Sequence, residues 1–325
     1  MGTLWHAFGL RTKSTHSRKD ARAHASKKHQ CAQIVSEHAN EEEETVAEKW
    51  IIGAIKHPVS NQDHFVSPTN HRPDRRVALA LMAHPDDAEF TCAGTLIRLA
   101  ETGWDVHIAT TTAGDCGALE GSPEEIAKTR IAEGTRAAES AGLSFHCLGQ
   151  PDGRVVYDRE SLQQTIDLFR QIAPSLVITM PLSDYHADHE VTGQLGRAAS
   201  FVYAAPNASA VPLQEGSTVP YLYYCDGHGG VDRMGNPIEP TVCVDITEQL
   251  DRKTEMLACH ASQREWLKAH NGIDEYLSKM RDDCIDRGRQ FGTEAAEVFV
   301  QHRGHGHPHE DLLAELFPLR SLSDH

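Results

Sequence analysis

Apolar segments typical of buried strands alternate with helix-like segments between residues 76 and 180, and this alternation limits the possible folds more than any other feature. The run RVALALMA is almost continuously apolar, as expected of a strand covered on both faces. Similar strand patterns recur at 104–112, 144–149 and 174–180, and helical patterns lie between them at 94–103, 122–142 and 159–173. The order predicts an α/β fold with a Rossmann-like, mostly parallel sheet flanked by helices.

Local signals support these boundaries. Ser122 precedes Pro123 and is followed three residues later by Glu125, which is the pattern of a capping box with proline in the first helical turn. Gly103 and Gly142 follow the last helical residues, where glycine commonly ends a helix. No G-x-G-x-x-G follows the first strand, so the sequence disfavours a dinucleotide site.

The part of the chain after residue 190 is less regular and predicts an α+β extension. It begins with a helix at 190–205. Strand patterns then occur at 220–226 and 241–246, with a short edge strand expected at 296–302, and helices are expected at 248–267, 273–292 and 310–317.

The first 75 residues read as a disordered tail. Residues 1–30 contain seven lysines and arginines and one acidic residue, residues 41–44 are EEEE, and no apolar period runs through the region. It contains no hydrophobic core of a signal peptide, and its weak likeness to an organellar transit peptide is less favoured than an extended N-terminus. We therefore expect one domain at 76–318 and a short tail at 319–325.

Composition excludes several functions. The formal charge of −16, from 31 basic and 47 acidic residues, argues against binding to nucleic acid or to an anionic membrane surface. The eight cysteines form no C-x-x-C pair, so a thiolate zinc site is not expected. Several of these cysteines lie in apolar segments, which favours a reducing compartment and a cytoplasmic location. A homo-oligomer is expected.

Two of the predicted strands end in residues that bind metals. Ligands of open parallel sheets bind beyond the carboxyl ends of the strands. The first strand ends in AHPDD and the fourth in PLSDYHADHE, which together place these side chains at one edge: His84, Asp86, Asp87, Asp184, His186, Asp188 and His189. Imidazole and carboxylate suit zinc or a similar divalent ion. Taken singly, HPDD could be a surface turn and H-x-D-H a helix cap, but their combination favours a metal site.

The pairing of AHPDDAEFTCAGTL with DYHADH about 100 residues later closely resembles the LmbE/PIG-L family of zinc-dependent N-acetyl-sugar deacetylases. The family includes the deacetylases of mycothiol and bacillithiol synthesis. The resemblance covers about residues 76–317. It implies that His84, Asp87 and His189 bind Zn²⁺, or another divalent metal such as Fe²⁺. It also implies that Asp86 is the general base.

Further roles are implied by the same resemblance. His186 is similar to the family's oxyanion-stabilising histidine, and Asp188 to the carboxylate that orients and charges it. Weaker matches place Arg130, Asp115 and Asp152 at the substrate. The sequence departs from the family in having Thr91 and Ala93 where glycines are common and Ala88 where a carboxylate is usual, and Tyr185 matches the family's tyrosine only in an uncertain register.

The residue types together predict hydrolysis of an amide. Zinc lowers the pKa of its water to about 7 and polarises the acyl oxygen, Asp86 transfers the proton, and His186 stabilises the oxyanion. We expect removal of acetyl from an N-acetylated amino sugar or its conjugate. Two alternatives stay open: an amidase acting on a non-sugar acylamine, and a non-catalytic metal-binding or carbohydrate-binding protein.

Some histidines receive less specific interpretations. Whether His228, in a loop at the same end of the sheet, lines the pocket stays open. The later cluster is expected to form a solvated turn rather than a metal site: His302, His305, His307 and His309.

Overall fold

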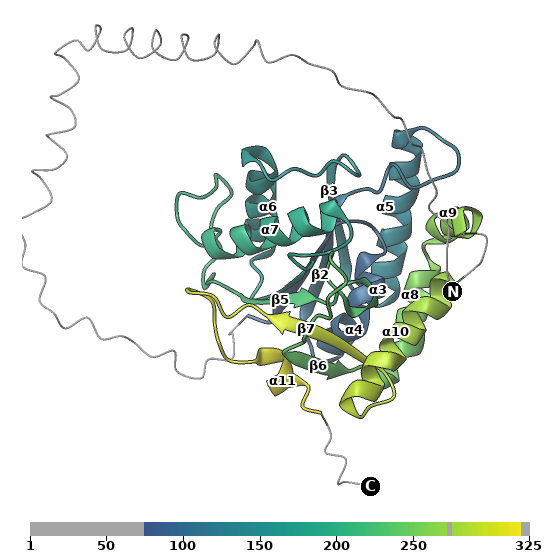
Figure 1. Ribbon diagram of the computed structural model, residues 1–325. Coiled ribbons are helices and arrows are strands. Elements are labelled where there is room, and N and C mark those ends of the chain that lie inside the picture. The colour runs from purple at the N-terminus through teal and green to yellow at the C-terminus, as the bar shows by residue number, and fades with distance from the viewer. Residues whose placement is uncertain (1–74, 272–274, 320–325) are drawn as a thin grey trace, which may run out of the picture. The chain divides into compact units, whose positions relative to one another are not determined.

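Seven strands form one mixed sheet in the order β3-β2-β1-β4-β5-β7-β6 in the computed structural model, which describes residues 75–271 and 275–319 (Figure 1). The expectations for the N-terminal tail and for the end of the C-terminal tail fall on residues outside this part. The strands are β1 (Val77–Met82), β2 (Asp105–Thr112), β3 (Ser144–Gln150), β4 (Leu176–Thr179), β5 (Tyr221–Cys225), β6 (Val242–Asp245) and β7 (Ala296–Gln301).

The first five strands run parallel to one another, as the alternating pattern predicts. Helices connect them and cover both faces of the sheet. They are α3 (Asp87–Thr91), α4 (Ala93–Glu101), α5 (Pro123–Ser140), α6 (Arg159–Ile172), α7 (Ala187–Val202), α8 (Leu250–Ala258), α9 (Ala261–Asn271), α10 (Tyr276–Phe291) and α11 (Leu312–Leu316), with short 3-10 turns η1 (His228–Gly230) and η2 (Thr247–Gln249). The α/β fold is therefore confirmed.

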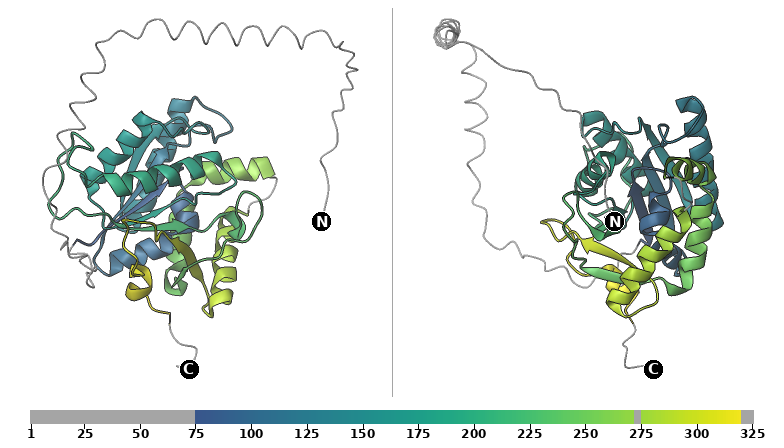
Figure 2. Two further views of the ribbon diagram at one scale, coloured as in Figure 1. Left: turned by 60° about the vertical axis from the view of Figure 1, so that its left-hand side comes forward. Right: turned by 45° about the vertical axis from the view of Figure 1, so that its right-hand side comes forward.

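The central strand β1 is buried along its whole length, which explains its continuous apolar sequence. Ala78, Ala80 and Met82 pack on one face with residues of α4, α5, α8 and α10. Leu79 and Leu81 pack on the other face with α6 and α7. The right-hand view of Figure 2 shows these two helical layers on opposite sides of the sheet.

The capping box forms as predicted. The Ser122 hydroxyl accepts a hydrogen bond from the Glu125 amide at 3.3 Å, and the Glu125 carboxylate accepts one from the Ser122 amide at 2.9 Å. Gly103 and Gly142 have positive φ values of 85° and 76°, the conformation that glycine adopts readily after a helix.

Two expectations for the C-terminal part are wrong. The helix expected at 248–267 is divided, because Cys259 and His260 form i→i−3 hydrogen bonds that end α8 before α9 begins. The strand expected at an edge, β7, lies between β5 and β6 and runs antiparallel to both. Its charged Glu297 suggests an exposed strand, but that carboxylate is buried in an ion pair with Lys253 at 2.6 Å.

In the part of the chain that the structure describes, no helix is long and apolar enough to cross a membrane.

Candidate active site

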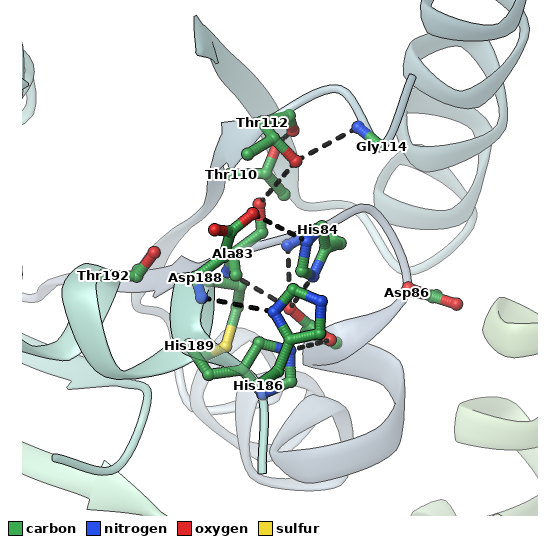
Figure 3. Close-up of polar contacts among 12 residues, drawn as sticks. Ala83, His84, Asp86, Thr110, Thr112, Gly114, His186, Asp188, His189 and Thr192 are labelled. Atoms are coloured by element: carbon green, nitrogen blue, oxygen red, sulfur yellow. Dashed lines mark hydrogen bonds and ion pairs between the residues drawn. The ribbon is translucent and has the colours of Figure 1, made fainter. Parts of the chain in front are cut away.

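The loops that follow β1, β2, β3 and β4 meet at the carboxyl edge of the sheet and bring the predicted side chains together (Figure 3). The rings of His84, His186 and His189 lie with centroids 4.8–5.3 Å apart. Asp188 and His189 belong to the first turn of α7, which begins at Ala187 and therefore three residues earlier than expected. Two motifs about 100 residues apart in the sequence thus form one cluster.

The turn after β1 orients Asp87 toward this cluster. Asp87 Oδ2 accepts hydrogen bonds from the amides of Ala83 at 3.1 Å and His84 at 2.7 Å. Its other oxygen, Oδ1, lies 3.5 Å from His189 Nε2. One carboxylate oxygen therefore fixes the turn, and the other faces an imidazole.

His84, Asp87 and His189 offer ligand atoms that all lie within 4.8 Å of one another. Two imidazoles and one carboxylate are a common donor set of catalytic zinc sites, which leave a further position for water or substrate. The three predicted ligands are thus close enough together to hold one ion.

A carboxylate lies beside each of the two imidazoles in this set. His84 Nε2 lies 3.1 Å from Asp152 Oδ1, and His189 Nδ1 lies 3.1 Å from Asp184 Oδ1. Such carboxylates orient metal-binding histidines and increase the basicity of the ligating nitrogen. Asp184 also accepts a hydrogen bond from the His186 amide at 3.1 Å, so this residue organises the second loop.

The electrostatics of the cluster favour a cation. Burial lowers the pKa of His84, but the carboxylates of Asp152, Asp188 and Asp87 more than offset this and raise it well above its ordinary value. Burial likewise lowers the pKa of His189, and Asp87 and Asp184 raise it overall. Burial raises the pKa of Asp87, but His189 and His84 together bring it below its ordinary value. Carboxylates that draw protons onto both imidazoles would also stabilise a dication between them.

Two other groups have similar spacing but are otherwise engaged. In the group of His84, His186 and Asp188, both Asp188 oxygens accept backbone amides, from Gly153 at 2.7 Å and Val155 at 3.1 Å. The other group consists of Asp115, Cys116 and Asp152. Its members hydrogen-bond to one another: Asp115 accepts a hydrogen bond from the Asp152 amide at 3.0 Å, and Asp152 accepts one from the Cys116 amide at 3.1 Å.

His186 contacts Asp188 through the main chain. Its Nδ1 accepts a hydrogen bond from the main-chain N–H of Asp188 at 3.2 Å, so that nitrogen is unprotonated. Burial, together with the neighbouring His84 and His189, lowers the pKa of His186. With Nδ1 accepting this hydrogen bond, a proton on the ring lies on Nε2, and the Asp188 carboxylate opposes the lowering of the pKa of His186. The Asp188 carboxylate lies 3.5 Å from His84 Nε2.

Asp86 is held apart from the three histidine rings (Figure 3). It has a φ of 110°, a conformation that is unfavourable for a residue other than glycine. Its Oδ2 accepts a hydrogen bond from the Tyr276 hydroxyl at 2.6 Å, and its Oδ1 one from Arg130 Nη2 at 3.3 Å. Burial raises the pKa of this carboxyl, and Arg130 opposes the shift.

The three predicted substrate residues have different surroundings. Arg130 lines the cavity but is 3% exposed, and it donates to the carbonyl groups of Pro85 at 2.6 Å and Gly114 at 3.0 Å as well as to Asp86. Asp152 also lines the cavity. Asp115 lies outside the cavity lining and accepts a hydrogen bond from the main-chain amide of Asp152. Arg130 thus joins the loops after β1 and β2, a structural role that the sequence does not reveal.

A cavity of about 1030 Å³ opens from the cluster toward α9 and α10. His228, whose position the sequence leaves open, lines this cavity, and its ring lies 5.6 Å from the ring of the exposed Tyr185. Sequence reasoning also missed Tyr276, Trp266 and Arg287, which line the same cavity. Tyr276 is 190 residues from Asp86, and no local motif could have indicated their contact.

The later histidine cluster is only partly the solvated turn that was expected. His307 is buried, its Nε2 lies 3.2 Å from the Ser200 hydroxyl, and its ring packs against His302 at 4.5 Å. His302 Nδ1 in turn lies 3.2 Å from the Tyr224 hydroxyl. These contacts anchor the segment to β5 and α7.

Comparison with known proteins identifies the family of this chain. The family model of GlcNAc-PI de-N-acetylase (PIG-L) matches residues 79–200. A 1D-myo-inositol 2-acetamido-2-deoxy-alpha-D-glucopyranoside deacetylase of Rhodococcus jostii is 30% identical over 242 residues, spanning 58% of this chain and 82% of the relative. A diacetylchitobiose deacetylase of Thermococcus kodakarensis is 29% identical over 198 residues, 58% of this chain and 71% of the relative.

Another relative is named for a different activity. The 4-oxalmesaconate hydratase of Pseudomonas putida is 24% identical over 253 residues, 74% of this chain and 92% of the relative. Among solved structures, N,N'-diacetylchitobiose deacetylase from Pyrococcus horikoshii superimposes with a TM-score of 0.60 at 24% identity, covering 74% of this chain and 89% of that one, and so shares the fold. On the matched residues and these relatives, the chain belongs to the PIG-L family of GlcNAc-PI de-N-acetylases.

Proposed function

We propose that this protein is a metal-dependent N-deacetylase that removes the acetyl group from an N-acetylated amino sugar or its conjugate. The observation that carries the proposal is the cluster of His84, Asp87 and His189, whose ligand atoms lie within 4.8 Å of one another beside a cavity that also contains Asp86. Zinc suits this donor set best, and Fe²⁺ is the alternative.

The ion held by these three side chains would lower the pKa of a water molecule and polarise the acyl oxygen. Asp86 is the group that accepts the proton of the attacking water. It then passes this proton to the nitrogen of the amine as the C–N bond breaks, so that acetate and a free amino sugar leave. Arg130 and Tyr276 hold the Asp86 carboxylate for this purpose.

His186 supplies the hydrogen bond to the oxyanion in this proposal. Because Nδ1 accepts the Asp188 amide, Nε2 carries the proton and can donate it in a hydrogen bond. A single donor of this kind contributes roughly 10²–10³ in rate. Asp188 contributes indirectly, through its main-chain contact to His186 and its carboxylate beside His84.

The location and the alternatives follow from the same residues. The seven described cysteines are all free thiols, which supports a reducing, cytoplasmic compartment. A non-catalytic binding protein would need no base in the position of Asp86. An amidase acting on a non-sugar acylamine, and a hydratase like the Pseudomonas putida relative, remain the competing activities.

Two adjacent aspartates provide the test. Asp87→Asn should lose bound zinc, because a neutral amide oxygen is a weaker ligand. Asp86→Asn should keep zinc and lose roughly 10²–10⁴ in kcat for acetate release from N-acetylglucosamine conjugates. Zinc content and acetate release are measured on both variants, and hydration of 4-oxalmesaconate is measured on the wild type. Equal zinc and equal activity in the two variants would overturn the proposal, as would hydratase activity without deacetylation.

A further inference from the structure

The short helix that carries Asp87 depends on the rest of the fold for its position. This helix, α3, has five residues, whereas isolated helices shorter than about 12–15 residues are marginal in water. Its N-cap residue, Asp86, forms no side-chain capping hydrogen bond and has a φ of 110°. Such a backbone conformation persists only where the surrounding contacts fix it. The position of α3 therefore has to be explained by contacts from other elements.

A buried ion pair contacts the junction of α3 and α4. The Lys253 ammonium, on α8, donates a hydrogen bond to the main-chain carbonyl of Phe90 at 3.1 Å and pairs with the Glu297 carboxylate at 2.6 Å. Glu297, on β7, accepts hydrogen bonds from the main-chain amides of Gly94 at 2.8 Å and Thr95 at 2.7 Å. One ion pair thus binds the last turn of α3 and the first turn of α4.

The two charges match the helix ends that they contact. A helix leaves carbonyl groups without partners at its C-terminal end and amides without partners at its N-terminal end. Cys92, which separates the two helices, forms no side-chain capping hydrogen bond, so the ion pair supplies these partners. Burial lowers the pKa of Lys253, but Cys284 and Glu297 raise it overall, so the ammonium is charged.

Lys253 is placed to support α3 rather than to bind a substrate. It contributes to the cavity lining, but its side chain is fully buried, and its ammonium is bound by two oxygens. Two further contacts hold α3 from the same C-terminal segment: Glu89 lies 3.4 Å from His260 Nε2, and the Phe90 ring packs on Tyr276 at 5.2 Å. All these contacts come from residues that follow the part matched by the family model.

A displacement of α3 would act directly on the proposed metal site. Asp87 is the first residue of α3, and its Oδ1 lies 3.5 Å from His189 Nε2. The side chains of a metal site have to be held within about 0.5 Å of the productive geometry. A change at the far end of a five-residue helix is therefore large enough to move this carboxylate out of place.

We infer that Lys253 is a positioning residue for the metal site. Its ammonium, together with the Glu297 carboxylate, fixes the junction of α3 and α4, so that Asp87 lies where it can share an ion with His84 and His189. The inference rests on the proposed metal-dependent function. It adds that metal binding requires a buried ion pair in the segment that follows the family match.

The zinc dissociation constant of the folded protein tests this inference. It is measured by competition with a chelator of known affinity, at a temperature where circular dichroism shows each variant to be folded. Lys253→Met should weaken zinc binding about tenfold, the lower end of the range of about 10- to 100-fold for outer contacts of metal ligands. The visible spectrum of the Co²⁺-loaded variant should also change, because that spectrum depends on the ligand geometry.

Arg170→Met is the matched control. It too removes a buried cation that donates to main-chain carbonyls, those of Ala205 and Val211, but Arg170 lies on α6 in the opposite helical layer. The variant should lose stability and change the zinc dissociation constant less than about twofold. An equal loss of zinc affinity in Arg170→Met and Lys253→Met would overturn the inference.

The double variant Lys253→Met/Glu297→Gln separates positioning from stability, and it also serves if Lys253→Met alone does not fold. It leaves no buried charge unpaired, and its glutamine can still accept the amides of α4, so part of the stability should return. The Phe90 carbonyl still lacks its donor, so zinc binding should stay weak. Recovery of zinc affinity together with stability would show a purely structural role and reject the inference.

Two further measurements distinguish this inference from the proposed function. Full zinc content in His189→Ala would reject the proposed metal site and the inference with it. Weaker zinc binding in Lys253→Met, without acetate release by the wild type, would reject the deacetylase and retain the positioning role. Acetate release by the wild type, with equal zinc affinity in Lys253→Met, would do the reverse.

Discussion

Removal of one hydroxyl group, that of Tyr276, should slow the reaction without changing the metal site. The hydroxyl donates to Asp86 Oδ2 at 2.6 Å, and the ring packs against Phe90 at 5.2 Å. Tyr276→Phe keeps the ring and its packing and deletes only the donor. A hydrogen bond to a charged group contributes about 1.5–3 kcal/mol, which corresponds to about a 10- to 150-fold change.

The expected result is a loss of that size in kcat, with little change in KM and with full zinc content. The loss arises because Asp86, whose backbone conformation is unfavourable, then has Arg130 as its remaining side-chain donor among the described contacts. Acetate release gives kcat and KM, and metal analysis gives the zinc content. In the Asp86→Asn background the same substitution should cost much less, because the carboxylate that it positions is gone.

Tyr223→Phe is the matched control. Tyr223 is also buried, and its hydroxyl donates to the Asp311 carboxylate at 3.1 Å, remote from the catalytic residues. Its loss should lower stability and leave kcat unchanged. The reasoning is refuted if Tyr276→Phe keeps the wild-type kcat, or if it loses as much in the Asp86→Asn background as in the wild type.

Three further outcomes concern stability and domain limits. Lys253→Met should destabilise the fold by about 3–5 kcal/mol in urea unfolding, because the buried Glu297 loses its partner, and Lys253→Met/Glu297→Gln should recover part of this. Burial and His302 lower the pKa of His307 in the folded protein to about 4, whereas in the unfolded chain the pKa of this imidazole is about 6.5. Between these two pH values the unfolded chain therefore binds more protons than the folded protein. Stability should therefore rise from pH 4 to 6.5, and the slope should flatten in His307→Gln. A chain that begins at residue 74 keeps the contacts of Arg75 to Gln214, and its Tm and kcat should equal those of the full chain.

The sequence predicts those parts of the site that depend on neighbouring residues and on the ends of strands. His84, Asp87 and His189 could be placed together because parallel strands end at one edge, and hydrophobic runs identify those strands. The helix caps follow equally local rules, as Ser122 shows. These features depend on a few adjacent residues and therefore leave a pattern in the sequence.

Contacts between distant segments leave no such pattern. The burial of Glu297 depends on Lys253, and without that partner a charged strand resembles an exposed edge. The supporting contacts of Asp86 come from α5 and α10, and the orientation of the His186 ring depends on a single main-chain N–H. Each depends on the three-dimensional packing of segments whose register the sequence alone does not specify.

The position of β7 between β5 and β6 has a consequence for folding during synthesis. When β6 leaves the ribosome its hydrogen-bonding partner does not yet exist, because β7 begins about 50 residues later. The edge of β5, which ends about 70 residues before β7 begins, remains unpaired for longer, and at about 5–20 residues per second both intervals last several seconds. A nascent chain can assemble β1 to β4, the first and last of which are followed by the proposed metal-binding residues, and still lack Tyr276. The hydroxyl that we propose positions Asp86 therefore arrives only with the C-terminal segment, and a chain released early would leave a β-edge open to pairing with other chains.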